Sequence, residues 1–556
     1  MGKDLEIKGD EEVPACQSIS RMKQPYQTAS LKDWEGFKEF YESNPDSLFH
    51  PLTINKDYAF HIAASTGNRQ LLRDLLEMIP IPRIQEALTQ LKDEYGNTAL
   101  HEVATSDNVD AAEFLVKMLW KSIDETEQII EDHEIDPSCK MDQFLKVKNN
   151  LGETPLYRAA ALGNAKMVKY LAGEIEKVGV TKASHFYRYD TISIFHIAVL
   201  AQHFDIAIWL LKKHKQLGEE KDMNGLTGFH MLALMPSAFR STSTSHMSIP
   251  QKLIYYCLPN DYDAGKALAQ LPSSQREDVE TGMRNNIPVY TIEQPKKRGA
   301  ISRMYITICS CLKEWAAIDA IWKEKNKHES ALRLAKFLAK QDFSWKYSYK
   351  AEEDSTISLG LGKGGEKGTQ NSKEGSKATT SEKSETLIEI PLLLAAREGI
   401  EEIFNEILNE YPLAVDHVSN NGHNVLHLAI LHRQDKIFER LKKMETSVQK
   451  LASKIDNNGN TILHQVAETK HYEGGNRPGP AFQFQEELTW YQCYKHILAF
   501  ELAKNLIAKD TSSDNSSIDD VNYLIFQKKS FKKEKEGSTS SDSRATGSGS
   551  GWLCRS

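Results

Sequence analysis

The sequence predicts an all-α protein, a solenoid of short helical repeats arranged in two blocks. Two observations favour this fold. One short phrase of residues recurs along the chain, and each copy is followed by apolar residues at helical spacing, as at Met167, Val168 and Leu171. A unit of two short helices cannot bury its apolar face alone, so such units are stable only when they stack.

The recurring phrase places a histidine between apolar residues and follows it with alanine. Thr98–Ala104 reads TALHEVA, Thr154–Ala160 reads TPLYRAA, and Asn424–Ala429 reads NVLHLA. More divergent copies begin at Ala59, Ile194, Gly228 and Ile462. This phrase resembles the T-P-L-H-x-A signature of the ankyrin repeat, a unit of about 33 residues with a β-turn and two helices. The resemblance implies an ankyrin-repeat solenoid.

The position of the histidine in the phrase measures the length of each repeat. It is occupied by His61, His101, Tyr157, His196, His230, Leu394, His427 and His464, which are 40, 56, 39, 34, 164, 33 and 37 residues apart. The 56-residue step contains an acidic insert, Asp124 to Asp136, and the 164-residue step is too long for a loop. We therefore predict about five repeats and an N-terminal half-repeat in residues 26–236, and about three repeats in residues 387–475.

A turn rich in Asp, Asn and Gly precedes most copies of the phrase, as in Asp93–Asn97 and Asp456–Asn460. These residues supply the side-chain bonds and positive φ angles of tight turns. We expect a protein partner to bind the concave face, which the turn tips and first helices of successive repeats line. The turn tips are the candidate partner-binding residues, although solvated turn residues are the alternative for each. The candidates are Lys56, Asp57, Glu94, Tyr95, Asn150, Asp222, Met223, Asn420 and Asn457.

The recurrent histidines are predicted to be structural. A catalytic histidine acts at one site with a nucleophile or a carboxylate, whereas these stand one per repeat. We expect each ring to bond to backbone near the turn and to hold neighbouring repeats in register. The six are His61, His101, His196, His230, His427 and His464. No catalytic, cofactor-binding or metal-binding residue is predicted, and no cofactor, so the sequence does not favour an enzyme.

The long step between the blocks has two parts. Residues 250–348 are predicted to be a helical connector with two apolar stripes, one from Met304 to Trp322 and one from Ala331 to Leu338. These helices either cover an exposed end of the first block, which we favour because terminal repeats need caps, or dock a partner. Residues 351–386 contain six glycines and no aromatic residue, and are predicted to be a disordered linker. We also expect disorder in residues 1–25.

Composition and short motifs exclude several other classes of protein. The net charge of −8 argues against general nucleic-acid binding, and the seven scattered cysteines form no metal or disulfide pattern. Gly360–Gly365 matches G-x-G-x-x-G without the strand and helix that a dinucleotide site needs. Lys296–Arg298 is read as a solvated turn rather than a nuclear or lipid signal. No window resembles a membrane span or signal peptide, so a cytoplasmic location is expected.

The last third of the chain carries a more specific series of motifs. These are Pro391–Ile400, Asn409–Pro412, Asn424–Ala429, Asp456–His464 and Gly479–Tyr491. Their order resembles the plant ankyrin-repeat proteins that end in a four-pass membrane domain with a Pro-Gly-Gly motif, of the accelerated-cell-death and salt-tolerance type. The resemblance covers residues 26 to about 500.

That resemblance implies a protein-binding scaffold in plant stress or defence signalling at the cytoplasmic face of the plasma membrane. Residues 476–510 would be the helical segment that precedes the family's membrane domain. Residues 511–556 are a low-complexity tail here, so the membrane domain is expected to be missing. The alternative is a truncated or splice form of a four-pass membrane protein with a channel- or transporter-like role.

Overall fold

The computed structural model describes residues 22–106, 108–129, 137–179, 183–258, 316–341 and 389–468, together with Gln485, Glu487, Leu488 and Trp490. The chain divides into two compact units, Met1–Asp342 and Phe343–Ser556, and each is described by itself. The described residues form helices and three isolated β-bridges, with no longer strand among them. The predicted all-α repeat fold is confirmed within this part of the chain.

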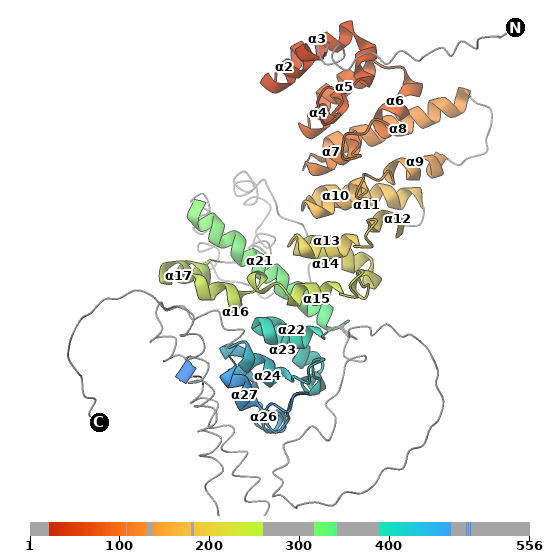
Figure 1. Ribbon diagram of the computed structural model, residues 1–556. Coiled ribbons are helices and arrows are strands. Elements are labelled where there is room, and N and C mark those ends of the chain that lie inside the picture. Colours follow the sequence, from red (N-terminus) through yellow and green to blue (C-terminus); the bar gives the residue numbers. More distant parts are fainter. Residues whose placement is uncertain are drawn as a thin grey trace, which may run out of the picture. The chain divides into compact units, whose positions relative to one another are not determined.

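The first unit is a stack of helix pairs that follow one another in chain order (Figure 1). Its first helices are α4 (Ala59–Ser65), α7 (Ala99–Thr105), α10 (Pro155–Ala161), α13 (Ile194–Leu200) and α15 (Gly228–Ala233). Its second helices are α5 (Arg69–Glu77), α8 (Val109–Ile129), α11 (Ala165–Val178) and α14 (Phe204–Lys213). Helices α2 (Lys23–Leu31) and α3 (Trp34–Ser43) precede the pairs, and η1 (Pro45–Phe49), α6 (Ile81–Thr89), α9 (Pro137–Leu145), α12 (Ala183–Phe186) and η2 (Lys215–Gly218) connect them.

Small buried side chains let the first helices pack closely. Each first helix contacts the first helix of the next repeat, from α4 through α7, α10 and α13 to α15. Ala63, Ala104, Ala159 and Ala198 in these helices are completely buried. Each alanine therefore contributes to a core that two neighbouring repeats form together.

The recurrent histidine connects each first helix to its own turn and, in two repeats, to the next repeat. Nδ1 of His101 accepts a hydrogen bond from the Thr98 N–H at 3.2 Å, and Nε2 lies 3.0 Å from the Glu153 carbonyl oxygen. His61 makes the same pair of contacts, with the Tyr58 N–H and, at 2.9 Å, with the Asn97 carbonyl oxygen. Because Nδ1 accepts, Nε2 carries the proton and donates, so the ring is neutral.

The remaining copies of this position differ from that arrangement. Nδ1 of His196, His230 and His464 accepts a bond from the N–H of its own cap residue. His427 instead stacks on His423 at 5.9 Å between ring centroids, while the Asn424 side chain caps its helix. The expectation that each ring joins neighbouring repeats thus fits His61 and His101 best.

Two further helices close the C-terminal end of this unit. Helix α21 (Ala316–Ala339) packs against α14, α15 and α17 (Ile249–Cys257), after the short segments η3 (Pro236–Ala238), α16 (Arg240–Ser243) and η4 (Thr244–His246). Trp322 packs on Leu258, and the Tyr255 hydroxyl lies 2.8 Å from Nδ1 of His328. The two predicted stripes meet on one helix here, because Ile318–Trp322 and Ala331–Leu338 both belong to α21. The stripe before residue 316 lies outside the described residues, as do residues 1–21, the linker at 351–386 and the tail at 511–556. The prediction of disorder up to residue 25 is wrong at its end, because α2 begins at Lys23 and buries Pro25.

The second unit repeats the same pattern on a smaller scale (Figure 1). Its helices are α22 (Pro391–Glu398), α23 (Glu401–Glu410), η6 (Pro412–Asp416), α24 (Val425–Leu431), α25 (Asp435–Lys442), α26 (Glu445–Ala452) and α27 (Ile462–Ala467). A buried ion pair joins α24 and α27 to a later segment. The Arg433 guanidinium donates to both Glu487 carboxylate oxygens, at 3.1 and 2.9 Å, and also to the Val466 carbonyl oxygen at 2.9 Å.

Replacing His101 with alanine should destabilise the first unit more than the equivalent change at His464 destabilises the second. The His101→Ala variant loses a buried bond and leaves the Glu153 carbonyl without its partner, at a cost of about 2–4 kcal/mol. His464 is exposed, so its loss should cost less than about 1 kcal/mol. Hydrogen exchange of the α7, α10 and α27 amides would measure both effects, and equal loss of protection in the two variants would contradict the prediction.

Acid should destabilise the fold between pH 6.5 and pH 4. Burial lowers the pKa of His101, His230 and His427 to about 4 each, whereas an unfolded histidine titrates near about 6.5. The unfolded chain therefore binds more protons in this window, and stability falls as the pH falls, by up to about 1.4 kcal/mol per pH unit for each histidine. Urea midpoints measured from pH 7 to pH 5 would show this slope. The slope should be shallower in His101→Gln, and an unchanged slope would argue against the assignment.

Breaking the Arg433–Glu487 pair should destabilise the second unit. Arg433→Met leaves the Glu487 carboxylate buried without its cation, which costs about 3–5 kcal/mol. Adding Glu487→Met removes the stranded charge and should recover much of that loss. Hydrogen exchange in α24 and α27 would test the double-mutant cycle, and strictly additive effects would show that the pair is not coupled.

Candidate functional site

The turns that precede the first helices are joined to one another by backbone hydrogen bonds. The N–H groups of Glu94, Asn150 and Tyr189 donate to the carbonyl oxygens of Asn55, Tyr95 and Leu151, at 2.7, 2.9 and 3.3 Å. In the second unit, the Asn457 N–H donates to the Asn421 carbonyl oxygen at 3.0 Å. The first four turns of the first unit and the two turns of the second unit are thus each fixed relative to a neighbouring turn, and their tips form an ordered row.

Close approach between turns requires glycine at one position. Gly96 has a φ of +78°, and a Cβ there would lie 2.8 Å from the Asn150 backbone nitrogen. Both the backbone conformation and the space exclude a larger residue. The glycine of one turn therefore allows the next turn to dock on it.

Most of the predicted tip residues are exposed, but two hold their own turn together. Lys56, Glu94, Tyr95, Asn150, Met223, Asn420 and Asn457 are exposed. Asp57 and Asp222 are half-buried. The Asp57 carboxylate accepts from the Thr53 hydroxyl at 2.6 Å, and that of Asp222 accepts from the N–H groups of Asn224 and Leu226. Because these two carboxylates already accept hydrogen bonds within their own turns, they have less capacity to bind a partner. Asn150 and Asn457 also donate to the preceding turn, at the carbonyl oxygens of Glu94 and Asn420.

Five successive turns of the first unit each expose one large apolar side chain. We call this set the apolar tip row. It consists of Ile54, Tyr95, Leu151, Tyr189 and Met223, with relative exposures of 96, 64, 58, 67 and 73%. The turns of the second unit carry asparagine instead, at Asn420–Asn421 and Asn457–Asn458. Apolar side chains exposed on successive turns mark a surface that gains free energy when a partner covers it.

Two lysines lie beside the middle of the apolar tip row. Nζ of Lys92 donates to the Lys148 carbonyl oxygen at 3.0 Å, and Nζ of Lys148 donates to the Tyr187 carbonyl oxygen at 2.9 Å. The Lys148 ammonium also lies 5.2 Å from the centre of the Tyr189 ring, within the range of a cation–π contact. Each lysine side chain therefore reaches across to the next repeat and is held there by backbone.

The charge of these two ammonium groups is not neutralised by a carboxylate. Among the described residues, neither Lys92 nor Lys148 forms an ion pair. Burial, followed by the nearby Lys146, lowers the pKa of Lys148. By contrast, Lys56 pairs with Glu94 at 3.1 Å, and Lys146 pairs with Asp142 at 3.5 Å. Lys92 and Lys148 thus carry positive charge that remains available to a ligand.

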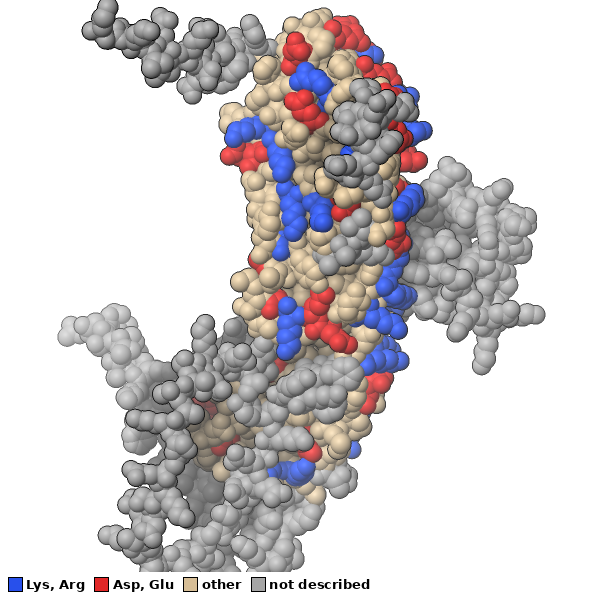
Figure 2. Space-filling model, turned by 90° about the vertical axis from the view of Figure 1, so that its right-hand side faces the viewer, with Lys and Arg blue, Asp and Glu red and all other residues tan. Residues whose placement is uncertain are grey.

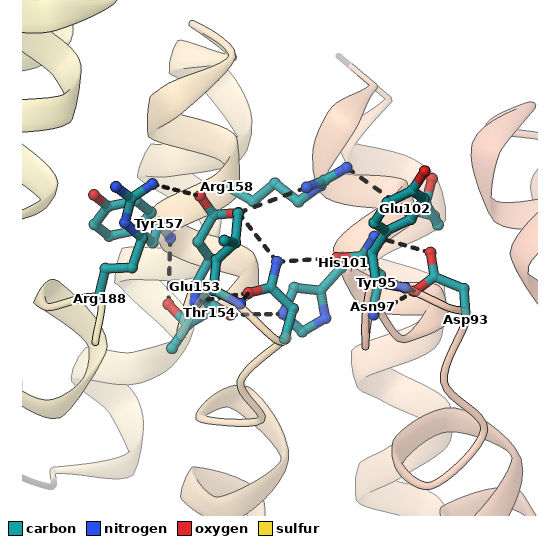
Figure 3. A network of polar contacts seen from close by, with 12 residues as sticks. Asp93, Tyr95, Asn97, His101, Glu102, Glu153, Thr154, Tyr157, Arg158 and Arg188 are labelled. Atoms are coloured by element: carbon teal, nitrogen blue, oxygen red, sulfur yellow. Dashed lines mark hydrogen bonds and ion pairs between the residues drawn. The ribbon is translucent and has the colours of Figure 1, made fainter. Parts of the chain in front are cut away.

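A buried polar network holds the turns of the second, third and fourth repeats in place (Figure 3). Glu153 lies at its centre, with its carboxylate 3.6 Å from Arg158 and 3.5 Å from Arg188. The Asn149 amide donates both to Glu153, at 3.0 Å, and to Asn97 in the preceding turn, at 3.1 Å. The network joins the three turns that carry Tyr95, Leu151 and Tyr189.

The face seen from the right-hand side of Figure 1 shows how charge is distributed over the described surface. Figure 2 shows Lys and Arg side chains gathered in a strip along the upper part of this face, with Asp and Glu side chains beside the strip, at the top and along the edge. The surface is thus mixed in sign overall but locally basic.

Other functions suggested by short motifs find no support within the described residues. No group of three or more His, Cys, Asp or Glu side chains is gathered as metal ligands in this part of the chain. Of the helices that the structure describes, none combines the length and apolar character needed to cross a bilayer. The motifs at Lys296–Arg298 and Gly360–Gly365 lie outside the described residues.

Sequence reasoning missed Ile54, Leu151 and Tyr189 as tip residues, and Lys92 and Lys148 beside them. Alignment of the turns would have found Leu151, since it precedes Gly152 as Tyr95 precedes Gly96. Tyr189 and Ile54 were harder to find, because Thr191 and Lys56 occupy the positive-φ positions of their turns in place of glycine. The lysines share a position one residue before the turn begins.

Comparison with known proteins agrees with the repeat geometry. No curated protein matches the chain. A family model for ankyrin repeats, in three copies, matches residues 386–475. Ankyrin repeats generally mediate protein–protein binding, and proteins built from them are typically non-catalytic. The chain therefore contains ankyrin repeats and is an all-α repeat protein.

Proposed function

We propose that the chain is a non-catalytic scaffold that binds a protein partner through the turn tips of its first unit. The observation that carries this proposal is the apolar tip row, in which five successive turns, the first four of them joined by backbone hydrogen bonds, each expose one large apolar residue. A partner that covers the row removes these side chains from water without reorganising the turns, because backbone bonds already hold them. A preorganised surface of this kind loses little conformational entropy on binding.

The size and composition of the row suit a protein interface. A standard interface buries about 800 Å² on each partner, and several adjacent repeats can supply that area. Tyrosines are enriched among the residues that dominate binding energy, and Tyr95 and Tyr189 lie within the row. The recurrent histidines support a non-catalytic role, since His61 and His101 use both ring nitrogens in structural bonds.

We further propose that this scaffold acts in plant stress or defence signalling at the cytoplasmic side of the plasma membrane. The order of motifs from Pro391 to Tyr491 supports this location and process through its resemblance to the plant family. Fractionation of plant cells that express the tagged chain would test it. Recovery with plasma membrane, followed by release in alkaline carbonate, is expected for a scaffold held by a protein. Retention after carbonate would favour the channel- or transporter-like alternative, and absence from the membrane fraction would reject the location.

Removing the apolar tip row should abolish partner binding without unfolding the chain. The variant combines Tyr95→Ser, Leu151→Ser, Tyr189→Ser and Met223→Ser. All four side chains are exposed, so stability should change by less than about 0.5 kcal/mol for each substitution. Affinity capture from plant extract, quantified by mass spectrometry, should show proteins that are lost from the variant by at least about tenfold, as expected when hot-spot residues are removed.

The matched control alters four exposed residues on the helices of the same unit, namely Lys117→Ser, Lys121→Ser, Lys169→Ser and Lys212→Ser. The proteins that depend on the row should remain bound to this control. If the tip variant retains the same proteins as the unaltered chain, the proposed binding surface is wrong.

A further inference from the structure

Lys92 and Lys148 form a regular pair on the first unit. Each comes directly before its turn, and each donates to a carbonyl oxygen of the next repeat, at 3.0 and 2.9 Å. Neither is paired with a carboxylate among the described residues. The second unit has Val418 and Ile455 at the corresponding position. The pair is therefore a particular feature of the first unit rather than a requirement of the repeat.

The geometry of the stack sets the distance between the two charges. Helices pack at about 8–10 Å from one another, so equivalent groups in adjacent repeats are separated by about that distance. An extended chain advances about 3.3 Å per residue. Two carboxylates that meet Lys92 and Lys148 together should therefore lie three residues apart in an extended segment.

The apolar tip row has the same period as the lysines. Tyr95, Leu151 and Tyr189 occupy the three turns that the two lysines connect, one in each repeat. A polyproline II segment has three residues per turn and rises about 3.1 Å per residue, so every third side chain faces the same side at about 9 Å. Such a segment can place one apolar side chain against each tip while its carboxylates face the lysines.

The local charges favour an acidic peptide over a nucleic acid. Glu94 pairs with Lys56 at 3.1 Å, and the Asp190 carboxylate beside Tyr189 pairs with Arg188. The whole chain has a net charge of −8, and Lys92 and Lys148 are two discrete charges rather than the cluster of Lys and Arg that a phosphate backbone favours. A peptide can match discrete ammonium groups and leave neutral residues opposite the carboxylates.

We propose that the turns of the second to fourth repeats bind an extended acidic segment of a protein partner, with carboxylates at every third residue and bulky apolar residues between them. Lys92 and Lys148 pair with two successive carboxylates, while Tyr95, Leu151 and Tyr189 cover the apolar side chains. This inference rests on the proposed scaffold function and adds the chemical class of the partner.

A series of synthetic peptides tests the spacing. Each labelled 12-residue peptide contains four Asp, four Leu and four Ser, with the aspartates in one unbroken run, at every second residue or at every third residue, and binding to the full chain is measured by fluorescence anisotropy. The peptide made of four copies of Asp-Leu-Ser should bind most tightly, and its affinity should fall as salt is added. Equal binding across the series, or no binding by any peptide, would overturn the proposal.

Matched variants test the residues. Lys92→Gln with Lys148→Gln should weaken binding of the Asp-Leu-Ser peptide about tenfold, the loss expected for two partly exposed ion pairs. Tyr95→Ser with Tyr189→Ser should weaken it to a similar extent. Lys117→Gln with Lys169→Gln removes the same charge from α8 and α11 and should change binding less than about twofold. Equal weakening by the two lysine pairs would show only a general charge effect and would reject the site.

The two proposals fail in different ways. If the proteins captured through the apolar tip row persist while the peptide series shows no optimum, the scaffold stands and the acidic-segment proposal falls. If capture does not depend on the tips, the scaffold proposal itself falls.

Discussion

The fold depends on the contact between neighbouring repeats. Each helix pair buries its alanine-rich face by packing against the next pair, so the hydrophobic core lies between repeats rather than within them. The apolar contacts between neighbouring repeats have little directional preference, so by themselves they would allow one repeat to slide slightly along the next. The hydrogen bonds from His61 and His101 to the next repeat do not tolerate such movement. They fix the register that the apolar contacts leave free.

The hydrogen bonds of the histidine rings also explain why polar groups can be buried between neighbouring repeats. A neutral ring accepts at Nδ1 and donates at Nε2, so it satisfies two backbone groups with one side chain. Burial stabilises the neutral form and lowers the pKa of His101 to about 4. Around it, Glu153 balances Arg158 and Arg188, and Asn149 completes the contacts to the preceding turn. The turns are therefore rigid for the same reason that the repeats are in register.

In the turns, the residues that stabilise the fold differ from the residues that are exposed to a partner. The side chains of Tyr95 and Met223 are exposed at the turn tips. The carboxylates of Asp93 and Asp222 instead stabilise their own turns by accepting hydrogen bonds from backbone N–H groups. The two units use the same scaffold with different tips, apolar in the first and asparagine in the second. Lys92 and Lys148 add a charge pattern with the period of the stack. One repeat architecture can in this way present distinct surfaces along a single chain.

Some of the candidate site could be predicted from individual residues. Tyr95 and Met223 stand in turns with a glycine that marks the tip, and both are exposed as expected of tips. Tyr189 could not be found in this way, because Thr191 takes the positive φ that glycine usually supplies. Asp57 and Asp222 resembled the other tip residues in sequence, but their carboxylates turn back to bond their own loops. Tyr157 occupies the histidine position, yet its buried hydroxyl has no hydrogen-bond partner among the described residues.

The sequence by itself determined the helical repeats, because the spacing of apolar residues, the Asp–Gly turns and the recurrent histidine are local signals, and most repeats carry at least two of them. Only the tertiary structure decided which side chains from different repeats meet. The ammonium groups of Lys92 and Lys148 are 56 residues apart in the chain but reach successive repeats of one row. That juxtaposition follows from stacking, which converts equivalent positions in distant segments into neighbours, and no local pattern of residues encodes it.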